Sequence, residues 1–183
     1  MELKTALSAA GVLLLVASAN MCAAPRAAHA PIEVRAIAMP ISAISTTQLN
    51  DSWGDARSGG RRHQGIDIMA PRGEAVRAIV DGEIIKLEHN ARGGISIYHR
   101  DARSTYTFYY AHLDGYAPEL REGDFVRQGQ VIAYVGSTGN ATTPHLHLEI
   151  RRAGENFWRG AAINPYPSLI DGRIVDREGS APN

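Results

Sequence analysis

The sequence predicts an all-β domain, mostly antiparallel, with a sandwich-like or barrel-like core, an open groove and little helix. Three observations support this fold class. Short runs rich in Val, Ile, Thr and Tyr recur along the chain, Gly-rich turns separate them, and no long segment has the apolar period of an amphipathic helix. Many short strands at regular spacing are typical of β sandwiches and barrels.

The charge balance and the cysteine content narrow the class of protein. The 183 residues carry 19 Lys or Arg and 19 Asp or Glu, so the formal net charge is zero. We therefore expect no nucleic-acid partner, and no membrane contact beyond a possible N-terminal anchor. Cys22 is the only cysteine, which excludes an internal disulfide. The hydrophobic core, with or without a metal, must then stabilise the fold. We expect a monomer.

Residues 1–30 have the features of an export signal. Lys4 supplies the positive charge, residues 6–19 are an almost unbroken run of small or apolar residues, and Ala17-Ser18-Ala19 offers a cleavage site. The segment is either a cleaved signal peptide or a retained signal anchor. In both cases we expect an exported domain, in the periplasm or cell envelope or secreted.

The segments after the signal are expected in the following order. Residues 31–50 form a linker with a short edge strand over 41–44, and residues 51–62 form a loop rich in Gly and Arg. Strands then follow over 75–80, 83–88, 95–99, 105–112, 124–127, 131–135 and 144–150. Asp81-Gly82 and the residues from Asn90 to Gly94 have the composition of hairpin turns.

Little helix is expected in the last part of the chain. Residues 164–167, with the sequence Asn-Pro-Tyr-Pro, predict a rigid extended segment that packs on the sheet. Residues 171–183 are expected to form a frayed tail.

The segment 144–150 contains two histidines separated by one residue. Because side chains alternate on a strand, His145 and His147 share one face, while Leu146, Leu148 and Ile150 share the other. Such a pair suits a metal site or a proton-transfer site, and it is also compatible with two ordinary core histidines.

Partners for this pair occur upstream. His63 and Asp67 lie four residues apart in an extended segment, and His112 ends the strand 105–112. A catalytic zinc site typically uses three protein ligands and leaves one position for water. His63, Asp67 and one histidine of the pair would supply those ligands. The remaining histidine and His112 would then serve proton transfer and charge stabilisation.

Three segments of the chain resemble the signature blocks of the lysostaphin/LytM-type zinc metallopeptidases, which are peptidoglycan endopeptidases with an antiparallel β core. They are residues 60–68, 110–113 and 144–149, with the sequences GRRHQGIDI, YAHL and PHLHLE. The resemblance runs from about residue 53 to residue 166 and implies a metallopeptidase domain over 51–170.

The resemblance also implies the role of each residue. His63, Asp67 and His147 match the zinc ligands, and His112 and His145 match the catalytic histidines. The choice of His147 over His145 as a ligand comes from the family, because strand alternation does not rank them. The presence of all five favours an active zinc endopeptidase. A non-catalytic wall-binding module that regulates other hydrolases, and a domain whose zinc is only structural, remain as alternatives.

Substrate contacts are expected from groups beside these histidines. The guanidinium groups of Arg57, Arg61 and Arg62 suit the free carboxylates of peptidoglycan peptide stems. Tyr109 or Tyr110 is expected to line the groove, with ordinary strand packing as the alternative for both, and Tyr110 is taken as the candidate substrate contact. One departure from the family lies between Gly139 and Pro144. Residues 140–143 read Asn-Ala-Thr-Thr, where a basic residue and a Gly are usual, and this change bears on substrate preference.

Overall fold

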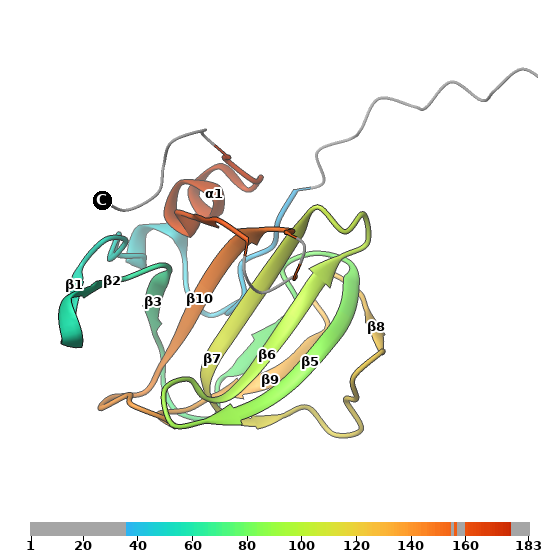
Figure 1. The fold of residues 1–183 in the computed structure, drawn as a ribbon. Coiled ribbons are helices and arrows are strands. Elements are labelled where there is room, and N and C mark those ends of the chain that lie inside the picture. Colours follow the sequence, from blue (N-terminus) through green and yellow to red (C-terminus); the bar gives the residue numbers. More distant parts are fainter. Residues whose placement is uncertain (1–35, 155, 157–159, 177–183) are drawn as a thin grey trace, which may run out of the picture. The chain divides into compact units, whose positions relative to one another are not determined.

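A computed structural model describes residues 36–154, 156 and 160–176 (Figure 1). Nine strands form one sheet with the path β11-β10-β7-β6-β5-β8, and every pairing in it is antiparallel. Outside this path, β3 pairs with β10, and β9 pairs with β4 and β7. The prediction of a mostly antiparallel β domain with little helix is confirmed.

The strands of the large sheet are β3 (Ile66–Met69), β4 (Ala75–Arg77), β5 (Gly82–Asn90), β6 (Gly94–Asp101), β7 (Tyr106–Tyr116), β8 (Phe125–Val126), β9 (Val131–Val135), β10 (His145–Arg152) and β11 (Ala162–Ile163). Two short strands, β1 (Ala56–Arg57) and β2 (Arg61–Arg62), form a separate ribbon around the 3-10 turn η2 (Ser58–Gly60). A second 3-10 turn, η1 (Thr46–Gln48), and one helix, α1 (Pro165–Asp171), complete the elements.

The core is formed by side chains from most strands of the large sheet. Fully buried aliphatic and aromatic residues from β3, β5, β6, β7, β9 and β10 meet in one cluster, which includes Ile66, Ile84, Ile97, Phe108, Tyr110, Leu113, Ile132, Leu146 and Leu148. In Figure 1 the long strands β5, β6, β7 and β10 run side by side around it. No helix among the described residues is long and apolar enough to cross a membrane.

The segment expected to be a linker joins the core from residue 37 onward. Ile37 and Ile41 are buried, and the backbone N–H of Ile37 donates to the carbonyl of Gly172. Residues 41–44 form no strand, so that prediction is wrong. The apolar positions 37 and 41 are instead inserted into the core by an irregular chain. The proposed signal, residues 1–30, lies outside the described residues.

The predicted hairpin at Asp81-Gly82 is also wrong. β4 pairs with β9, and β5 pairs with β6 and β8, so the strands on either side of this dipeptide are not partners. Gly82 is required by close strand packing, because a Cβ there would lie 2.0 Å from the carbonyl oxygen of Arg100. The Asp81 carboxylate accepts the backbone N–H of Gln128 and so fixes the turn before β9.

The segment 164–167 begins a helix where an extended segment was expected. Asn164 is the N-cap of α1 and accepts the backbone N–H of Tyr166, and Pro165 occupies the first helical position. Proline is favoured there because its missing N–H would have no partner inside the helix. The helix ends at Gly172, which adopts the left-handed conformation. Of the predicted tail, residues 177–183 lie outside the described part, and Asp176 pairs with Arg152.

The fold contains one buried histidine away from the groove. His99 on β6 is fully buried, and burial lowers its pKa to about 4, although Asp81 acts in the opposite direction. Its Nδ1 lies 3.4 Å from the hydroxyl of Tyr110, and its Nε2 has no hydrogen-bond partner among the described residues. The folded protein therefore holds His99 neutral, whereas an unfolded chain protonates it near pH 6.5.

We expect His99 to make the protein acid-labile. Because its pKa is lower in the folded state, its contribution is fully present above about pH 6.5 and is lost as the pH falls toward 4. The expected loss is roughly 3 kcal/mol of unfolding free energy. Urea unfolding of the wild type and of His99→Gln at pH 7.5 and 4.5 checks this, and equal losses in both proteins would contradict it.

Candidate metal centre and groove

Strand β10 supplies the middle of the site. Leu146, Leu148 and Ile150 are fully buried, and His145, His147 and Glu149 alternate with them on the other face. In the antiparallel register, His147 lies opposite Asp67 of β3 on one side and opposite Ala111 of β7 on the other. Pairs that lie directly opposite have close Cβ atoms, so the sheet itself brings His147 and Asp67 together.

Gly65 allows the chain before β3 to approach β10. A Cβ at this position would lie 2.3 Å from the carbonyl oxygen of Leu148. The chain can therefore pass directly over β10, and His63, two residues earlier, reaches His147. The two imidazole rings are 4.8 Å apart between centroids, and His63 is 4% exposed.

His63, Asp67 and His147 form a group that could hold a metal ion. Nε2 of His63, Oδ1 of Asp67 and Nδ1 of His147 are 2.9 to 3.2 Å from one another. Tetrahedral zinc with bonds of about 2.0–2.1 Å needs donors about 3.3 Å apart, so a small expansion of this group fits zinc. Two imidazoles and one carboxylate are also the donor types of catalytic zinc sites.

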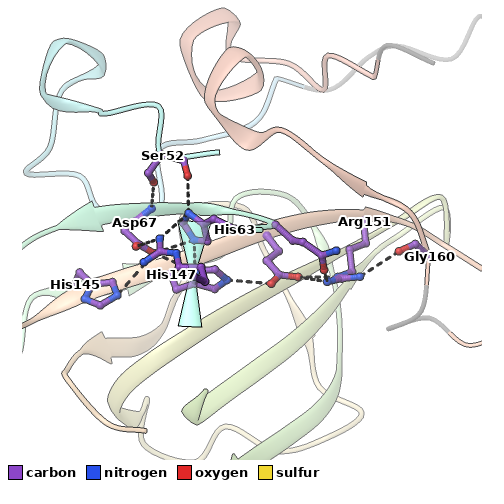
Figure 2. Close-up of polar contacts among 10 residues, drawn as sticks. Ser52, His63, Asp67, His145, His147, Arg151 and Gly160 are labelled. Carbon is purple, nitrogen blue, oxygen red and sulfur yellow. Dashed lines mark hydrogen bonds and ion pairs between the residues drawn. The ribbon is translucent and has the colours of Figure 1, made fainter. Parts of the chain in front are cut away.

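The outer atoms of two ligands are held by other groups (Figure 2). Nδ1 of His63 donates to the carbonyl of Ser52 at 2.7 Å, and the hydroxyl of Ser52 accepts the backbone N–H of Asp67. Nη2 of Arg57 donates to Oδ2 of Asp67 at 2.5 Å. It also lies 2.7 Å from Nδ1 of His63. When the proton of His63 is on Nδ1 it is donated to Ser52, because a guanidinium cannot accept, and Nε2 is then the nitrogen that could bind a metal.

The charges of this cluster are strongly coupled. Burial alone would raise the pKa of Asp67, but hydrogen bonds from His147 and His63 hold it far below its usual range. Burial alone would lower the pKa of His147, but hydrogen bonds to Asp67 and Glu149 raise it to about 9. A bound divalent cation takes the place of the proton on such a ligand.

A bulge in β7 directs His112 into the groove. Phe108 and Tyr110 are fully buried in the core, so alternation would place His112 there too. Instead the pairing with β6 shifts by one residue, and His112 adopts a left-handed φ of 62°. Ala111 and His112 then line the groove consecutively, and Leu113 returns to the core. A left-handed residue other than glycine is a strained conformation of the kind that occurs at functional sites.

The two remaining histidines lie side by side next to the ligands. The ring centroids of His112 and His145 are 4.8 Å apart, and Nε2 of His145 is 3.7 Å from Oδ1 of Asp67. Nδ1 of His112 lies 2.9 Å from the carbonyl of Thr138, and Nδ1 of His145 lies 2.8 Å from that of Thr143. Because a carbonyl only accepts, both Nδ1 atoms carry a proton and both Nε2 atoms are free to accept one. Burial lowers the pKa of His112 to about 4, so it is neutral at pH 7.

These five side chains lie on the floor of an open groove of about 930 Å³. Its walls come from the ribbon β1–β2 with the residues that follow it, the turn between β5 and β6, the loop before β10, and side chains of β6, β7 and β10. They include Arg57, Arg61, Arg62, Gln64, Asn90, Arg92, Tyr98, Tyr109, Asn140, Thr142, Glu149 and Arg151. The departure from the family in residues 140–143 therefore borders the groove. Arginines outnumber carboxylates on these walls, which favours acidic ligands.

The predicted substrate contacts differ in their placement. Arg61 and Arg62 are exposed on the groove wall. Arg57 also lines the groove, but its closest contact is with the proposed ligand Asp67. Tyr110 does not line the groove, so the structure contradicts its prediction as a substrate contact. It is fully buried, and its hydroxyl accepts the backbone N–H of Ile79. Tyr109 is the neighbour that faces the groove.

The burial of Tyr110 gives a direct test of this correction. Tyr110→Phe removes the acceptor of a buried N–H, so we expect a loss of about 1–2 kcal/mol in unfolding free energy. We expect no change in KM, because the hydroxyl does not reach the groove. Urea unfolding and steady-state kinetics of this variant check both parts, and a raised KM at unchanged stability would contradict them.

Comparison with known proteins agrees with this site. The sequence pattern of peptidase family M23 matches residues 61–165, more than half of the chain. The L-Ala--D-Glu endopeptidase of Bacillus subtilis is 36% identical over 152 residues, which cover 78% of this chain and 45% of that protein. The chain thus spans less than half the length of this relative.

Solved structures have the same fold. The catalytic domain of lysostaphin from Staphylococcus simulans aligns with a TM-score of 0.60 and 29% identity, over 68% of this chain and 95% of that one. A zinc-containing peptidase from Vibrio cholerae aligns with a TM-score of 0.57 and 28% identity, over 78% of this chain and 40% of that one. An antiparallel β domain with this His/Asp/His group in a groove defines the metallopeptidase class. The chain belongs to peptidase family M23.

Sequence reasoning missed several groups of this site. Ser52 and the carbonyl groups of Thr138 and Thr143 act through the backbone or from distant loops, and no sequence pattern marks them. Glu149 had a readable signal. It follows His147 by two residues on the same strand and therefore lies on the same face.

Proposed function

We propose that this domain is a zinc endopeptidase that hydrolyses amide bonds in the peptide stems or crosslinks of peptidoglycan. The observation that carries the proposal is one cluster on the floor of the groove. Three side chains can hold zinc, and two further histidines with defined proton positions lie beside them. A metal that served only structure would not require the second pair.

The proposed chemistry divides the five residues into two groups. Zinc held by His63, Asp67 and His147 would supply a Lewis acid for the scissile carbonyl and acidify a water molecule. His112 and His145 each keep Nδ1 on a backbone carbonyl, so Nε2 is the nitrogen that exchanges a proton. One would accept the proton of the attacking water and the other, when protonated, would donate to the developing oxyanion.

The proposed substrate class follows from the groove walls. Arg61 and Arg62 are exposed there, and Arg57 lies nearer to the metal position. Guanidinium groups pair with carboxylates in a forked geometry, which suits peptide stems with free carboxyl groups. The B. subtilis relative is named for a bond next to D-Glu, an acidic residue. We therefore favour a stem peptide with free carboxylates as the substrate.

The location is part of the proposal. The positive and then apolar sequence of residues 1–30 supports export, by a cleaved signal peptide or a retained anchor. The domain would act as a monomer in the periplasm or cell envelope, or after secretion.

Incubation with defined muropeptides tests this function. Mass spectrometry of the products should show fragments released by hydrolysis, lost on addition of a chelator and restored by zinc. The masses of the fragments identify the bond. With intact sacculi, sedimentation of the protein without release of fragments would favour the wall-binding module. Chelator-induced unfolding without any hydrolysis would favour a structural metal.

A further inference from the structure

The outer nitrogen of His147 faces a buried carboxylate. Nε2 of His147 lies 3.0 Å from Oε1 of Glu149, and each side chain is 12% exposed. An ionised carboxylate only accepts, so Nε2 of His147 carries a proton. Nδ1 faces His63 and the carboxylate of Asp67, so in the metal-free site it can carry a proton as well. Zinc bound at Nδ1 would replace that second proton, and Glu149 is the described contact that would keep the remaining proton on Nε2.

Arg151 holds Glu149 in this position. Its Nε and Nη2 atoms lie 2.7 and 2.5 Å from Oε2 of Glu149, which leaves Oε1 for His147. Nη1 donates to the carbonyl of Gly160, and Nη2 donates to Oε1 of Gln64. Gln64 follows His63 directly, so one guanidinium connects the segments that carry two of the proposed metal ligands.

We propose that Glu149, fixed by Arg151, is a positioning residue that sets the tautomer and orientation of His147 and so the affinity of the site for zinc. The inference rests on the zinc site of the proposed function, but not on the substrate. Groups that hold the outer N–H of a metal-bound histidine typically change metal affinity 10- to 100-fold when they are removed.

Glu149→Gln is the sharpest test, because it keeps the shape and removes one acceptor. A carboxamide has a single oxygen, which can serve Arg151 or His147 but not both. If the oxygen turns to Arg151, the NH₂ group faces Nε2 and favours the tautomer with a proton on Nδ1. We therefore expect zinc affinity, measured by competition with a chelator, to fall roughly 10- to 100-fold.

A matched control is Glu83→Gln. Glu83 also pairs with an arginine, Arg100, at 2.6 Å, but it does not line the groove. The zinc affinity of the Glu83→Gln variant should equal that of the wild type. Thermal unfolding of both variants in the presence of chelator separates any loss of fold from the loss of affinity. Zinc affinity of Glu149→Gln within twofold of the control would overturn the inference.

A measurement on the wild type covers the case in which Glu149→Gln does not fold. In isotope-labelled, zinc-loaded protein, nuclear magnetic resonance should detect a slowly exchanging proton on Nε2 of His147. A proton on Nδ1, or metal bound through Nε2, would overturn the inference. Neither readout uses hydrolysis. Failure to cleave muropeptides would therefore count against the proposed function alone.

Discussion

Replacing His147 with alanine should abolish zinc binding and hydrolysis together. His147 supplies one of three donor atoms within 3.2 Å of one another, and it contacts both other ligands. Two remaining donors bind zinc far more weakly than three. Without the metal, the pKa of the attacking water molecule is no longer lowered. Metal analysis after dialysis should find almost no zinc, because one of the three protein ligands is missing. Muropeptide cleavage should fall to background.

His89→Ala is a suitable control for this variant. His89 is exposed on β5 and does not line the groove, so zinc content and cleavage should stay at wild-type levels. A full equivalent of zinc in His147→Ala would disprove its assignment as a ligand.

Replacing His112 with alanine should leave zinc bound and remove most turnover. His112 touches the ligand cluster only through ring contacts, with its centroid 5.8 Å from that of His147. A positioned proton-transfer group typically contributes 10²- to 10⁴-fold, so we expect kcat to fall by about that factor. Metal analysis and steady-state kinetics of the same preparation measure the bound zinc and kcat.

The left-handed backbone at residue 112 calls for a second variant. Alanine is strained at a φ of 62°, whereas asparagine tolerates this region better. His112→Asn should therefore fold at least as well as His112→Ala and be just as inactive. If either variant cleaves at close to the wild-type rate, His112 is not catalytic.

Strand alternation predicted part of this site from sequence alone. The buried face of Leu146, Leu148 and Ile150, with His145 and His147 opposite, requires only a period of two. The resemblance to the metallopeptidase family then assigned His63 and Asp67 as partners. The structure brings these side chains together, and their roles await the experiments above.

The same rule failed where a bulge interrupts the strand. On a regular strand Tyr110 and His112 would share a face, and Tyr110 would line the groove with His112. The extra residue in β7 reverses the alternation, so Tyr110 enters the core and Tyr109 faces the groove. Sequence periodicity does not reveal a bulge at a residue other than glycine, because nothing in the side chain of His112 demands it.

Turn signals were misread for a related reason. Asp81-Gly82 has the composition of a hairpin turn. The structure requires glycine at position 82 for another reason, because the backbone of Arg100 on the neighbouring strand packs against it. Glycine marks a close approach as readily as a turn, and only the pairing of distant strands distinguishes the two. Asn164-Pro165 was also ambiguous, since this pair begins helices as well as extended segments.

The pairing of β10 with β3 and β7 has a consequence for assembly of the chain. A slip of β10 by one residue would point Leu146, Leu148 and Ile150 outward and both histidines into the core. The metal site and the hydrophobic core would then be lost in the same event. Only a chain with the correct register can bind zinc, so zinc uptake during refolding would report when segments 80 residues apart have paired correctly.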